Sequence, residues 1–539
     1  MLLDSGFPPL NIEVRKRPDF TSPLGDNRGM ELATEVCRRA RIARDPRFDG
    51  RFFIAVKTTK IYCRPICAVR GPLESNVTYY PSAAAAAEAG YRPCLRCRPE
   101  ASPGTPAWFG ASASVSRALK LIGESALDLG GVDDLAARLG LGARHLRRLF
   151  LRYLGAPPVA VAQTRRIHFA KKLIDETDLP MTRVAIASGF RSIRRFNATF
   201  QALYGRSPSR LRALSAGGGK VRAVVSTQEG TADRYTFRLG YRPPYDWSSL
   251  AGFLAQRATP GVESVTGEEY RRTISIQGVA GTIAVRPVPD RHALELQIQF
   301  TDPSLLFRIV ERTRRIFDLG ADPEEIANHL GQDRRLRSLV AANPGLRVPG
   351  CWDGFEIAVR AILGQQVSVK AATTFAGRLA ERFGEALPGG DGRLFPSANA
   401  LAHADFAGIG LTQKRVETIR ALAQAVVSGD LVFDSTLDPD QFEKKITSLP
   451  GIGPWTAQYI AMRLGEPDAF PGGDLYLRDV AHEAAAWRPW RAYAAMHLWK
   501  SAAGKSAAGK SAAGKSATGK SAAGKSAAGK ISGGEIGGR

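Results

Sequence analysis

Four of the six cysteines in this 539-residue chain stand in two close pairs, and this spacing limits what the surrounding segment can fold into. Cys63 and Cys67 form a C-x3-C pair in IYCRPICAVR, and Cys94 and Cys97 form a C-x2-C pair in YRPCLRCRPE. Two such pairs can converge on one zinc ion with Zn–S bonds of about 2.3 Å, and a closed site of this kind can stabilise a small module. A structural zinc clip is one interpretation, and a reactive thiolate near an anion is the other.

Basic side chains surround both cysteine pairs, and the whole chain has a net charge of +24, which favours a polyanionic partner. The chain has no run of about 18 apolar residues, and its N-terminus, MLLDSGFPPL, lacks the pattern of a signal peptide. We therefore expect a cytoplasmic, nucleoid-associated protein with no membrane partner, in which paired cysteines are metal ligands or reactive thiols. The basic residues near the pairs are Lys57, Lys60, Arg64, Arg70, Arg92, Arg96 and Arg98.

The apolar pattern changes along the chain and predicts a multidomain protein that is mainly α with α+β parts. RTISIQ, GTIAVRP and HALELQIQF alternate apolar and polar residues, as strands do in a sheet with one solvent-exposed face, and the segments on either side have a helical period. The breakers ASPGTP and SAGGGK mark two linkers. The expected order is a flexible leader (1–28), a small zinc-bound α/β module (29–104), an all-α domain (112–214), an α+β sheet domain (234–305), a second all-α domain (306–500) and a tail (501–539).

The last segment has too few apolar residues to form a core. From Lys500 the sequence KSAAG occurs six times with one change, to KSATG, so glycine recurs at every fifth position and disorder is expected. It contains seven lysines and Arg539 but only one acidic residue, Glu535, and the rest of the chain is basic as well. The tail is either a solvated spacer or a polycationic arm that raises nonspecific DNA affinity through counterion release.

The cysteine segment resembles a known family. ARDPRFDGRFFIAVKTTKIYCRPICAVR and NVTYYPSAAAAAEAGYRPCLRCRP are similar to the N-terminal domain of the Ada adaptive-response family. In that family a cysteine bound to zinc irreversibly accepts a methyl group from a methylphosphotriester in DNA. The matching residue is Cys63, in the expected site of one zinc ion held by Cys63, Cys67, Cys94 and Cys97. The basic side chains around this site, Arg64 and Arg96 among them, are suited to contact with the DNA backbone.

The chemistry of a zinc-bound thiolate is consistent with this role. Zinc holds sulfur as a thiolate at neutral pH, ready to displace phosphate from a methyl carbon. Methylation of one thiolate makes the site less negative by one charge, which lowers its repulsion from DNA and makes repair a charge switch for tighter binding. Cys37 and Cys351 have no such partners, and we interpret both as small buried apolar residues.

The following helical segment contains two related units. VDDLAARLGLGARHLRRLFLRYLG is typical of helix, glycine-containing turn and helix, and MTRVAIASGFRSIRRFNATFQALYGRSPSRLR repeats that plan. The two units resemble the AraC-type DNA-binding domain, which implies that the second helix of each enters the major groove. No P-C-H-R acceptor segment follows, so repair of O6-methylguanine is not implied. The expected DNA-contacting residues are Arg144, His145, Arg147, Arg148, Arg191, Arg194 and Arg195.

A glycine-containing hairpin in the C-terminal half precedes an isolated aspartate. In LPGIGPWTAQYIAMRLGEPDAFPGGDLYLR, Gly451 and Gly453 allow backbone N–H groups to approach a DNA phosphate, and Asp474 follows about twenty residues later. With YRPPYDWSSLAGFLAQRA, VPGCWDGFEIAVRAILGQQVS and AAWRPWRAYAAMHLW, this segment resembles the helix-hairpin-helix glycosylases and, among them, the AlkA-type 3-methyladenine DNA glycosylase II.

The resemblance implies the residues that act on the base. Asp474 falls on the catalytic aspartate, which stabilises oxocarbenium character on the sugar and positions the attacking water once the nucleotide is flipped. Trp455, Tyr459 and Trp499 fall on pocket positions, where electron-rich rings attract a cationic alkylated base. Gln366 stands where the best-known relative inserts a leucine into the duplex.

Several differences from related enzymes narrow the expected reaction. Trp455 occupies the hairpin position at which bifunctional relatives carry a lysine, so no Schiff base and no strand cleavage are expected. No cysteine follows Cys351, so we expect no iron–sulfur cluster. Only 12 residues, Leu475 to Ala486, separate Asp474 from WRPW, fewer than in the family, so a helix behind the pocket is expected to be short or missing.

Together these features predict a fusion of an alkylation sensor with a base-excision enzyme. Methyl capture at Cys63 and promoter binding would serve transcriptional activation, with RNA polymerase as a partner, and Asp474 would remove alkylated bases such as 3-methyladenine from double-stranded DNA. One alternative is a transcription regulator whose glycosylase half only holds DNA. The other is a glycosylase whose zinc module is only an anchor.

Overall fold

The computed structural model describes residues 32–69, 71–103, 113–216, 233–387, 389, 392–433 and 438–504. The expected leader (1–28), Arg70 and the tail beyond residue 504 lie outside the described residues. Residues 501–504, which we expected to belong to the disordered tail, instead continue a helix that begins at residue 491. The alanines of this first repeat favour helix, and the packed turns before them supply the nucleus.

The N-terminal module is built around a four-stranded sheet. Its elements are α1 (Thr34–Ala43), β1 (Phe53–Val56), β2 (Ile61–Cys63), β3 (Val77–Tyr80), α2 (Ala83–Glu88) and β4 (Arg92–Pro93). The strand order is β3-β1-β2-β4, and β2 pairs with β4 in the parallel direction, whereas the other pairs are antiparallel. Helix α2 begins after Ser82, whose hydroxyl accepts the N–H of Ala85 at 3.0 Å, and its small alanines allow it to lie close to the sheet.

Residues 113–216 are helical, as predicted. The helices are α3 (Ala113–Gly123), α4 (Ala126–Leu129), α5 (Val132–Arg138), α6 (Ala143–Leu154), α7 (Pro158–Glu176), α8 (Met181–Ala187), α9 (Ile193–Tyr204) and α10 (Pro208–Ala216). Helices α6 and α9 each end at a glycine in the left-handed conformation, Gly155 and Gly205. The long α7 connects the two helix-turn-helix units.

The central sheet contains the three predicted strands and two that we did not predict. The elements are β5 (Asp233–Gly240), α11 (Trp247–Arg257), β6 (Glu263–Thr266), β7 (Glu269–Ile276), β8 (Val279–Val288) and β9 (Ala293–Phe300). The strand order is β5-β9-β8-β7-β6, and every pair is antiparallel. Alternate residues of β5 and β9 are buried, which confirms the predicted one-sided burial of the sheet.

The second helical domain follows the sheet. Its helices are α12 (Leu306–Ile316), α13 (Pro323–Leu330), α14 (Leu336–Ala342), α15 (Gly354–Leu363), α16 (Val369–Phe383), α17 (Ala398–Ala402), α18 (Gln413–Val427), α19 (Pro439–Thr447), α20 (Pro454–Arg463) and the helix 491–504. The nearly all-apolar α15 lies at the centre of this domain and contacts α16, α18 and α20.

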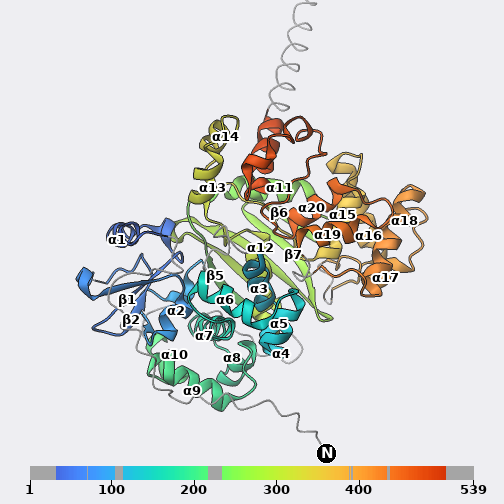
Figure 1. The fold of residues 1–539 in the computed structure, drawn as a ribbon. Coiled ribbons are helices and arrows are strands. Elements are labelled where there is room, and N and C mark those ends of the chain that lie inside the picture. The colour runs from blue at the N-terminus through green and yellow to red at the C-terminus, as the bar shows by residue number, and fades with distance from the viewer. Residues whose placement is uncertain are drawn as a thin grey trace, which may run out of the picture.

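The parts of the chain share hydrophobic cores rather than standing apart. In Figure 1 the central sheet separates the N-terminal module and helix-turn-helix units from the C-terminal helices α15 to α20. One core joins α7 to α10 to the central sheet and α12, and another joins α2 to α3, α5 and α6. The N-terminal module also contacts α13 through an ion pair between Arg51 and Asp322 at 3.0 Å. No helix of the described ranges is sufficiently long and apolar to cross a bilayer.

Candidate metal centre and candidate active site

The sheet of the N-terminal module brings the two cysteine pairs together. Cys63 ends β2 and Cys94 follows β4, and the parallel pairing of these strands places their ends side by side. The turns that follow carry Cys67 and Cys97. The four Sγ atoms all lie within 4.8 Å of one another, and none of the four is in a disulfide.

This arrangement fits a zinc ion. Four sulfurs bonded to one zinc at about 2.3 Å fall within the observed spread. The backbone N–H of Arg64 donates to the Sγ of Cys97 at 3.4 Å, a contact that favours a thiolate over a thiol. The donor set contains only sulfur, as in structural zinc sites with four cysteine ligands. The four cysteines therefore form the zinc site, as predicted.

The structure shows contacts of Arg64 within the protein that the sequence did not indicate. Its guanidinium group, which we expected at the DNA backbone, forms an ion pair with Asp49 and donates to the carbonyl of Cys97 at 3.1 Å. Only 13% of the Arg64 side chain is exposed, and its contacts hold the turn that carries Cys97 in place. Arg98 is likewise held by the buried Asp175 of α7 at 3.0 Å. Arg96 is exposed and remains available to a phosphate.

The remaining two cysteines differ in burial. Cys37 is fully buried, as predicted, and burial raises the pKa of its thiol to about 12. Cys351 is only partly buried at the residue level, although burial of the sulfur raises its pKa to about 12.

The second helix of each helix-turn-helix unit has one apolar and one basic face. Helix α6 buries Leu146, Phe150 and Leu154 and begins after a turn that contains Gly140 and Gly142. Helix α9 begins after Ser192, whose hydroxyl accepts the N–H of Arg195 at 3.4 Å. The predicted DNA-contacting residues Arg144, His145, Arg147, Arg148, Arg191, Arg194 and Arg195 are all exposed.

The predicted hairpin lies between α19 and α20. Gly451 has a φ of 81°, a conformation that favours glycine, and Gln365 donates to its carbonyl oxygen at 3.0 Å. Gly453 is the N-cap residue of α20, and no side chain caps the N–H groups of the first turn there. Gln366 is exposed, and its φ of 53° is a left-handed conformation that the helical residues of α15 and α16 on either side do not have.

The predicted catalytic aspartate and aromatic residues come together. The indole N–H of Trp499 donates to Oδ1 of Asp474 at 2.9 Å, and the backbone N–H of Tyr476 donates to the same oxygen at 2.9 Å. The rings of Trp455 and Tyr459 are stacked with centroids 5.7 Å apart, and those of Tyr459 and Trp499 lie 6.4 Å apart. In the described part of the chain no residue donates to Oδ2 of Asp474, so that oxygen is available for chemistry.

The short segment after Asp474 contains no α-helix, as predicted, but it is packed. Two short 3-10 turns, η6 (Arg478–Val480) and η7 (Ala484–Trp487), replace the helix. Trp487 is buried, and its indole N–H donates to Asp333 at 3.0 Å. The segment is therefore held to the hydrophobic core of its domain although it contains no α-helix.

The buried arginine that contacts the aromatic residue Tyr459 was not predicted from the sequence. Arg463 is 3% exposed and donates to the Tyr459 oxygen at 3.0 Å. The spacing of four residues between Tyr459 and Arg463 on a predicted helix was the available signal, because such residues share a helix face.

Comparisons with known proteins agree with this architecture. Family models match as the metal binding domain of Ada (36–100), a helix-turn-helix domain (135–213), the AlkA N-terminal domain (236–353) and the HhH-GPD superfamily of base excision DNA repair proteins (359–502). A probable bifunctional transcriptional activator/DNA repair enzyme AlkA of Mycobacterium tuberculosis is 43% identical over 86% of this chain and 96% of its own length.

Two further relatives match parts of the chain. DNA-3-methyladenine glycosylase 2 of Escherichia coli is 36% identical over 49% of this chain and 96% of its own length. The bifunctional transcriptional activator/DNA repair enzyme Ada of Escherichia coli is 38% identical over 23% of this chain and 34% of its own length.

The fold and the two sites define a zinc-thiolate DNA-binding protein joined to a helix-hairpin-helix base-excision domain. The chain belongs to the family of bifunctional transcriptional activators and DNA repair enzymes in which an Ada-type zinc module and helix-turn-helix domain precede an AlkA-type glycosylase. Double-stranded DNA is its partner.

Proposed function

We propose that this chain excises alkylated purines such as 3-methyladenine from duplex DNA at Asp474 and captures methyl groups from DNA phosphates at Cys63. The observation that carries the first activity is the contact between Asp474 and Trp499 beside the rings of Tyr459 and Trp455. The two donors on Oδ1 fix the carboxylate, and Oδ2 stays free to face the sugar.

The proposed excision is a hydrolysis. An alkylated purine is cationic, so it leaves as a neutral base when the bond between C1′ and the base nitrogen breaks and the electron pair goes to the base. The Asp474 carboxylate stabilises the positive charge that develops on the sugar and orients a water toward C1′. The new C1′–O bond forms from that water, whose proton passes to Asp474 and then to solvent.

The test is release of 3-methyladenine from methylated duplex DNA. We expect Asp474→Asn to lower the single-turnover rate by about a thousandfold, because the amide carries no charge to stabilise the sugar cation. Asp479→Asn is the matched control, since the Asp479 side chain is 84% exposed and lies in the same segment. A wild-type protein that binds DNA but releases no base would refute the proposal and favour the regulator alternative.

The proposed methyl capture takes place in the zinc module. Zinc, when bound, keeps the sulfurs deprotonated at neutral pH. The Cys63 sulfur attacks the methyl carbon of a methylphosphotriester, so that an S–C bond forms, the C–O bond breaks and its electron pair remains on the phosphate oxygen. Cys63, Cys67 and Cys97 are partly exposed and Cys94 is buried, so exposure excludes only Cys94, and the role of Cys63 rests on its match to the methyl-accepting cysteine of the family.

Peptide mass mapping after incubation with methylated DNA tests this step. We expect the mass of one methyl group on the peptide that contains Cys63 and none on the peptide that contains Cys351. An unmodified Cys63 in a folded, zinc-loaded protein would mean that the cluster is only structural.

The helix-turn-helix units complete the proposal. The exposed arginines of α6 and α9 support promoter binding, so methyl capture would increase transcription, with RNA polymerase as the partner of the activator. The free thiols are consistent with action in the cytoplasm on nucleoid DNA.

A further inference from the structure

A helix from the N-terminal half of the chain contacts the glycosylase half at the turn that follows α20. The ammonium group of Lys120 on α3 donates to the carbonyl oxygen of Gly465 at 3.0 Å. Gly465 has a φ of 86°, and its N–H donates to the carbonyl of Met462 at 3.0 Å, which closes α20. The cation of Lys120 therefore lies at the C-terminal end of α20, where a positive charge is favourable.

The charged groups at this contact come from both halves of the chain. Burial lowers the pKa of Lys120, and the charge of Glu466, which follows Gly465, opposes that shift. Burial raises the pKa of Glu466, and the charge of Lys120 opposes it in turn. Each group thus favours the charged form of the other.

Helix α3 also faces the start of α19. Burial lowers the pKa of Arg117, which lies three residues before Lys120, and the charges of Asp438 and Glu466 raise it. Asp438 is the N-cap residue of α19 and accepts the N–H of Gln441 at 2.8 Å. The start of α19 and the end of α20 both lie at the end of this helix pair that is opposite the hairpin. Helix α3 therefore supports the pair from the end away from the expected DNA.

The turn 465–468 joins the two helices that carry the candidate pocket residues. The backbone N–H of Ala492 donates to the carbonyl of Pro467 at 2.8 Å. This N–H belongs to the first turn of the helix 491–504, where it has no partner within the helix. That helix carries Trp499, and α20 carries Tyr459. A shift of the turn would therefore displace both aromatic side chains.

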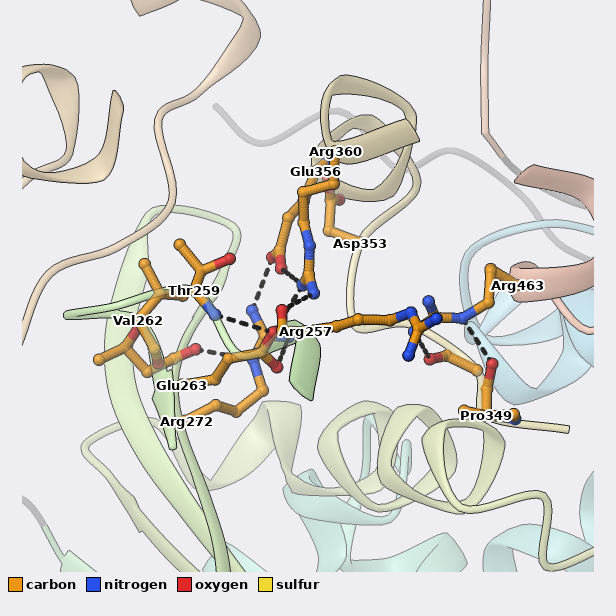
Figure 2. A network of polar contacts seen from close by, with 12 residues as sticks. Arg257, Thr259, Val262, Glu263, Arg272, Pro349, Asp353, Glu356, Arg360 and Arg463 are labelled. Carbon is orange, nitrogen blue, oxygen red and sulfur yellow. Dashed lines mark hydrogen bonds and ion pairs between the residues drawn. The ribbon is translucent and has the colours of Figure 1, made fainter. Parts of the chain in front are cut away.

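The other contacts of this region come from within the glycosylase half. Arg463, the last residue of α20, donates through Nε to the carbonyl of Pro349 at 2.7 Å (Figure 2) and through one Nη to that of Gly350 at 2.9 Å. Arg491 donates to the carboxylate of Asp468 at 2.8 Å. The contact from α3 adds a hold from the other half of the chain.

Helix α3 is itself fixed by contacts at its C-terminal end. Glu124, which follows α3, lies 3.3 Å from Arg308 of α12, and α3 lies beside α12 in Figure 1. Arg165 of α7 donates to the carbonyl of Leu119 at 2.9 Å. Lys120 thus extends from a fixed helix, so its ammonium group can define the position of the turn.

We propose that Lys120 is a positioning residue for base excision, because it holds the turn that joins the helices of Tyr459 and Trp499. This inference rests on the proposed excision at Asp474. Trp499 fixes Oδ1 of Asp474, so the placement of the helix 491–504 decides where the carboxylate lies when the sugar arrives. Helix α3 lies between the ranges matched to the Ada domain (36–100) and the helix-turn-helix domain (135–213), and neither range includes it.

The test measures release of 3-methyladenine from methylated duplex DNA under single-turnover conditions. We expect Lys120→Met, which keeps an unbranched side chain without its charge, to lower the rate constant at saturating protein about tenfold. The protein concentration that gives half of this rate should not change, because the DNA-facing hairpin is intact. Lys120→Arg, which keeps the charge, should restore most of the rate. A fraction of unfolded protein would lower the amplitude and leave the rate constant unchanged.

Lys172→Met is the matched control. Lys172 of α7 is 7% exposed, contacts the carbonyl of Arg238 on β5 and lies 2.9 Å from Glu176. The control therefore removes a buried cation where the same two halves meet, but at a contact with the sheet and not with the turn 465–468. Its rate constant should equal that of the wild type.

Hydrogen exchange followed by mass spectrometry reports on the turn without any excision. In Lys120→Met the peptide that contains Ala492 should exchange faster than in the wild type, because the carbonyl of Pro467 is held less firmly. In Lys172→Met the exchange of this peptide should not change.

Three results would overturn the inference. The first is a rate constant in Lys120→Met within twofold of the wild type, and the second is an equal loss in Lys120→Met and Lys172→Met. The third is unchanged exchange at Ala492 in Lys120→Met. A wild-type protein that releases no base would overturn the proposed excision itself, and the exchange at Ala492 would still show whether Lys120 holds the turn.

Discussion

Gly451 and Gly453 lie two residues apart in the hairpin, but their surroundings differ in how much space they leave for a side chain. A Cβ added to Gly451 would lie 2.1 Å from Oγ1 of Thr418, and its φ of 81° disfavours any other residue. A Cβ added to Gly453 would meet nothing within 4 Å. The first glycine is required by packing within the protein, and the second faces the side where DNA is expected.

We therefore expect Gly451→Ala to lower the free energy of unfolding by about 2 kcal/mol, whereas Gly453→Ala should leave it nearly unchanged. Gly453→Ala should instead weaken DNA binding, because its methyl group obstructs the approach of a phosphate. Denaturant unfolding and duplex binding measure the two effects. Equal losses of stability in both variants would show that this division of roles is wrong.

Part of the candidate sites could be predicted from the sequence, residue by residue. The zinc ligands follow from their spacing, and Asp474, Trp455, Tyr459 and Trp499 meet in the structure as the family resemblance implies. Their catalytic roles remain predictions. The contact of Arg64 with Asp49 was not predicted, because Asp49 lies fifteen residues earlier and only the folded sheet brings the two together.

Helices α6 and α9 are the elements on which promoter recognition depends. Replacing Arg144, Arg147 and Arg148 of α6 by alanine should lower the slope of log affinity against log salt by up to about 3, since each lost phosphate contact lowers it by about 1. We expect the same from Arg194 and Arg195 of α9 together with Arg191, which lies just before this helix. Base release at Asp474 should be unaffected.

Titration of promoter binding against salt measures these slopes. An unchanged slope in one helix variant would mean that this helix does not contact the backbone. A parallel loss of base release would indicate instead that the helices hold DNA for both activities.

Three strands with an alternating pattern were predicted, whereas β5 was missed although it alternates over eight residues, and the shortest elements were missed for lack of length. Strands β7, β8 and β9 have eight or more residues with alternating apolar and polar side chains, so their sequences predict strands. Strand β6 has only four residues, and η6 and η7 span three and four, which is too short for any period to emerge. Their positions depend on buried contacts such as that of Trp487 with Asp333.

At the scale of the whole molecule, Glu124 connects the helix-turn-helix domain to the glycosylase half. Its carboxylate pairs with Arg315, Arg312 at 3.4 Å and Arg308 at 3.3 Å, all on α12. Burial raises the pKa of Glu124, but the three guanidinium groups outweigh it and lower the pKa to about 2. The contact should therefore stabilise the protein fully above about pH 4.5 and lose that contribution as the pH falls toward 2.

We expect Glu124→Gln to destabilise the folded chain by about 2 kcal/mol near neutral pH, because three partly buried cations lose their shared partner. Calorimetry should show a lower melting temperature, and the difference from wild type should shrink below about pH 4.5. Glu88→Gln, at an exposed position, is the control. A difference independent of pH would contradict the assigned role of this carboxylate.

The sharing of cores between parts of the chain could not be read from the sequence. An apolar helix face has the same pattern whether it packs within its own domain or against a neighbour, so the joint core of α7 to α10 with the central sheet has no sequence signal. The types of the individual domains were predictable because each contains its own sequence motif.

The central claim is that one folded chain carries two independent repair chemistries. One experiment tests it most directly: a single preparation is incubated with duplex DNA that contains methylphosphotriesters and 3-methyladenine, and free base and methylated Cys63 are both quantified by mass spectrometry. We expect both products from the wild type and loss of only the free base from Asp474→Asn. A folded wild type that yields only one product, or an Asp474→Asn variant that still releases base at the wild-type rate, would contradict it.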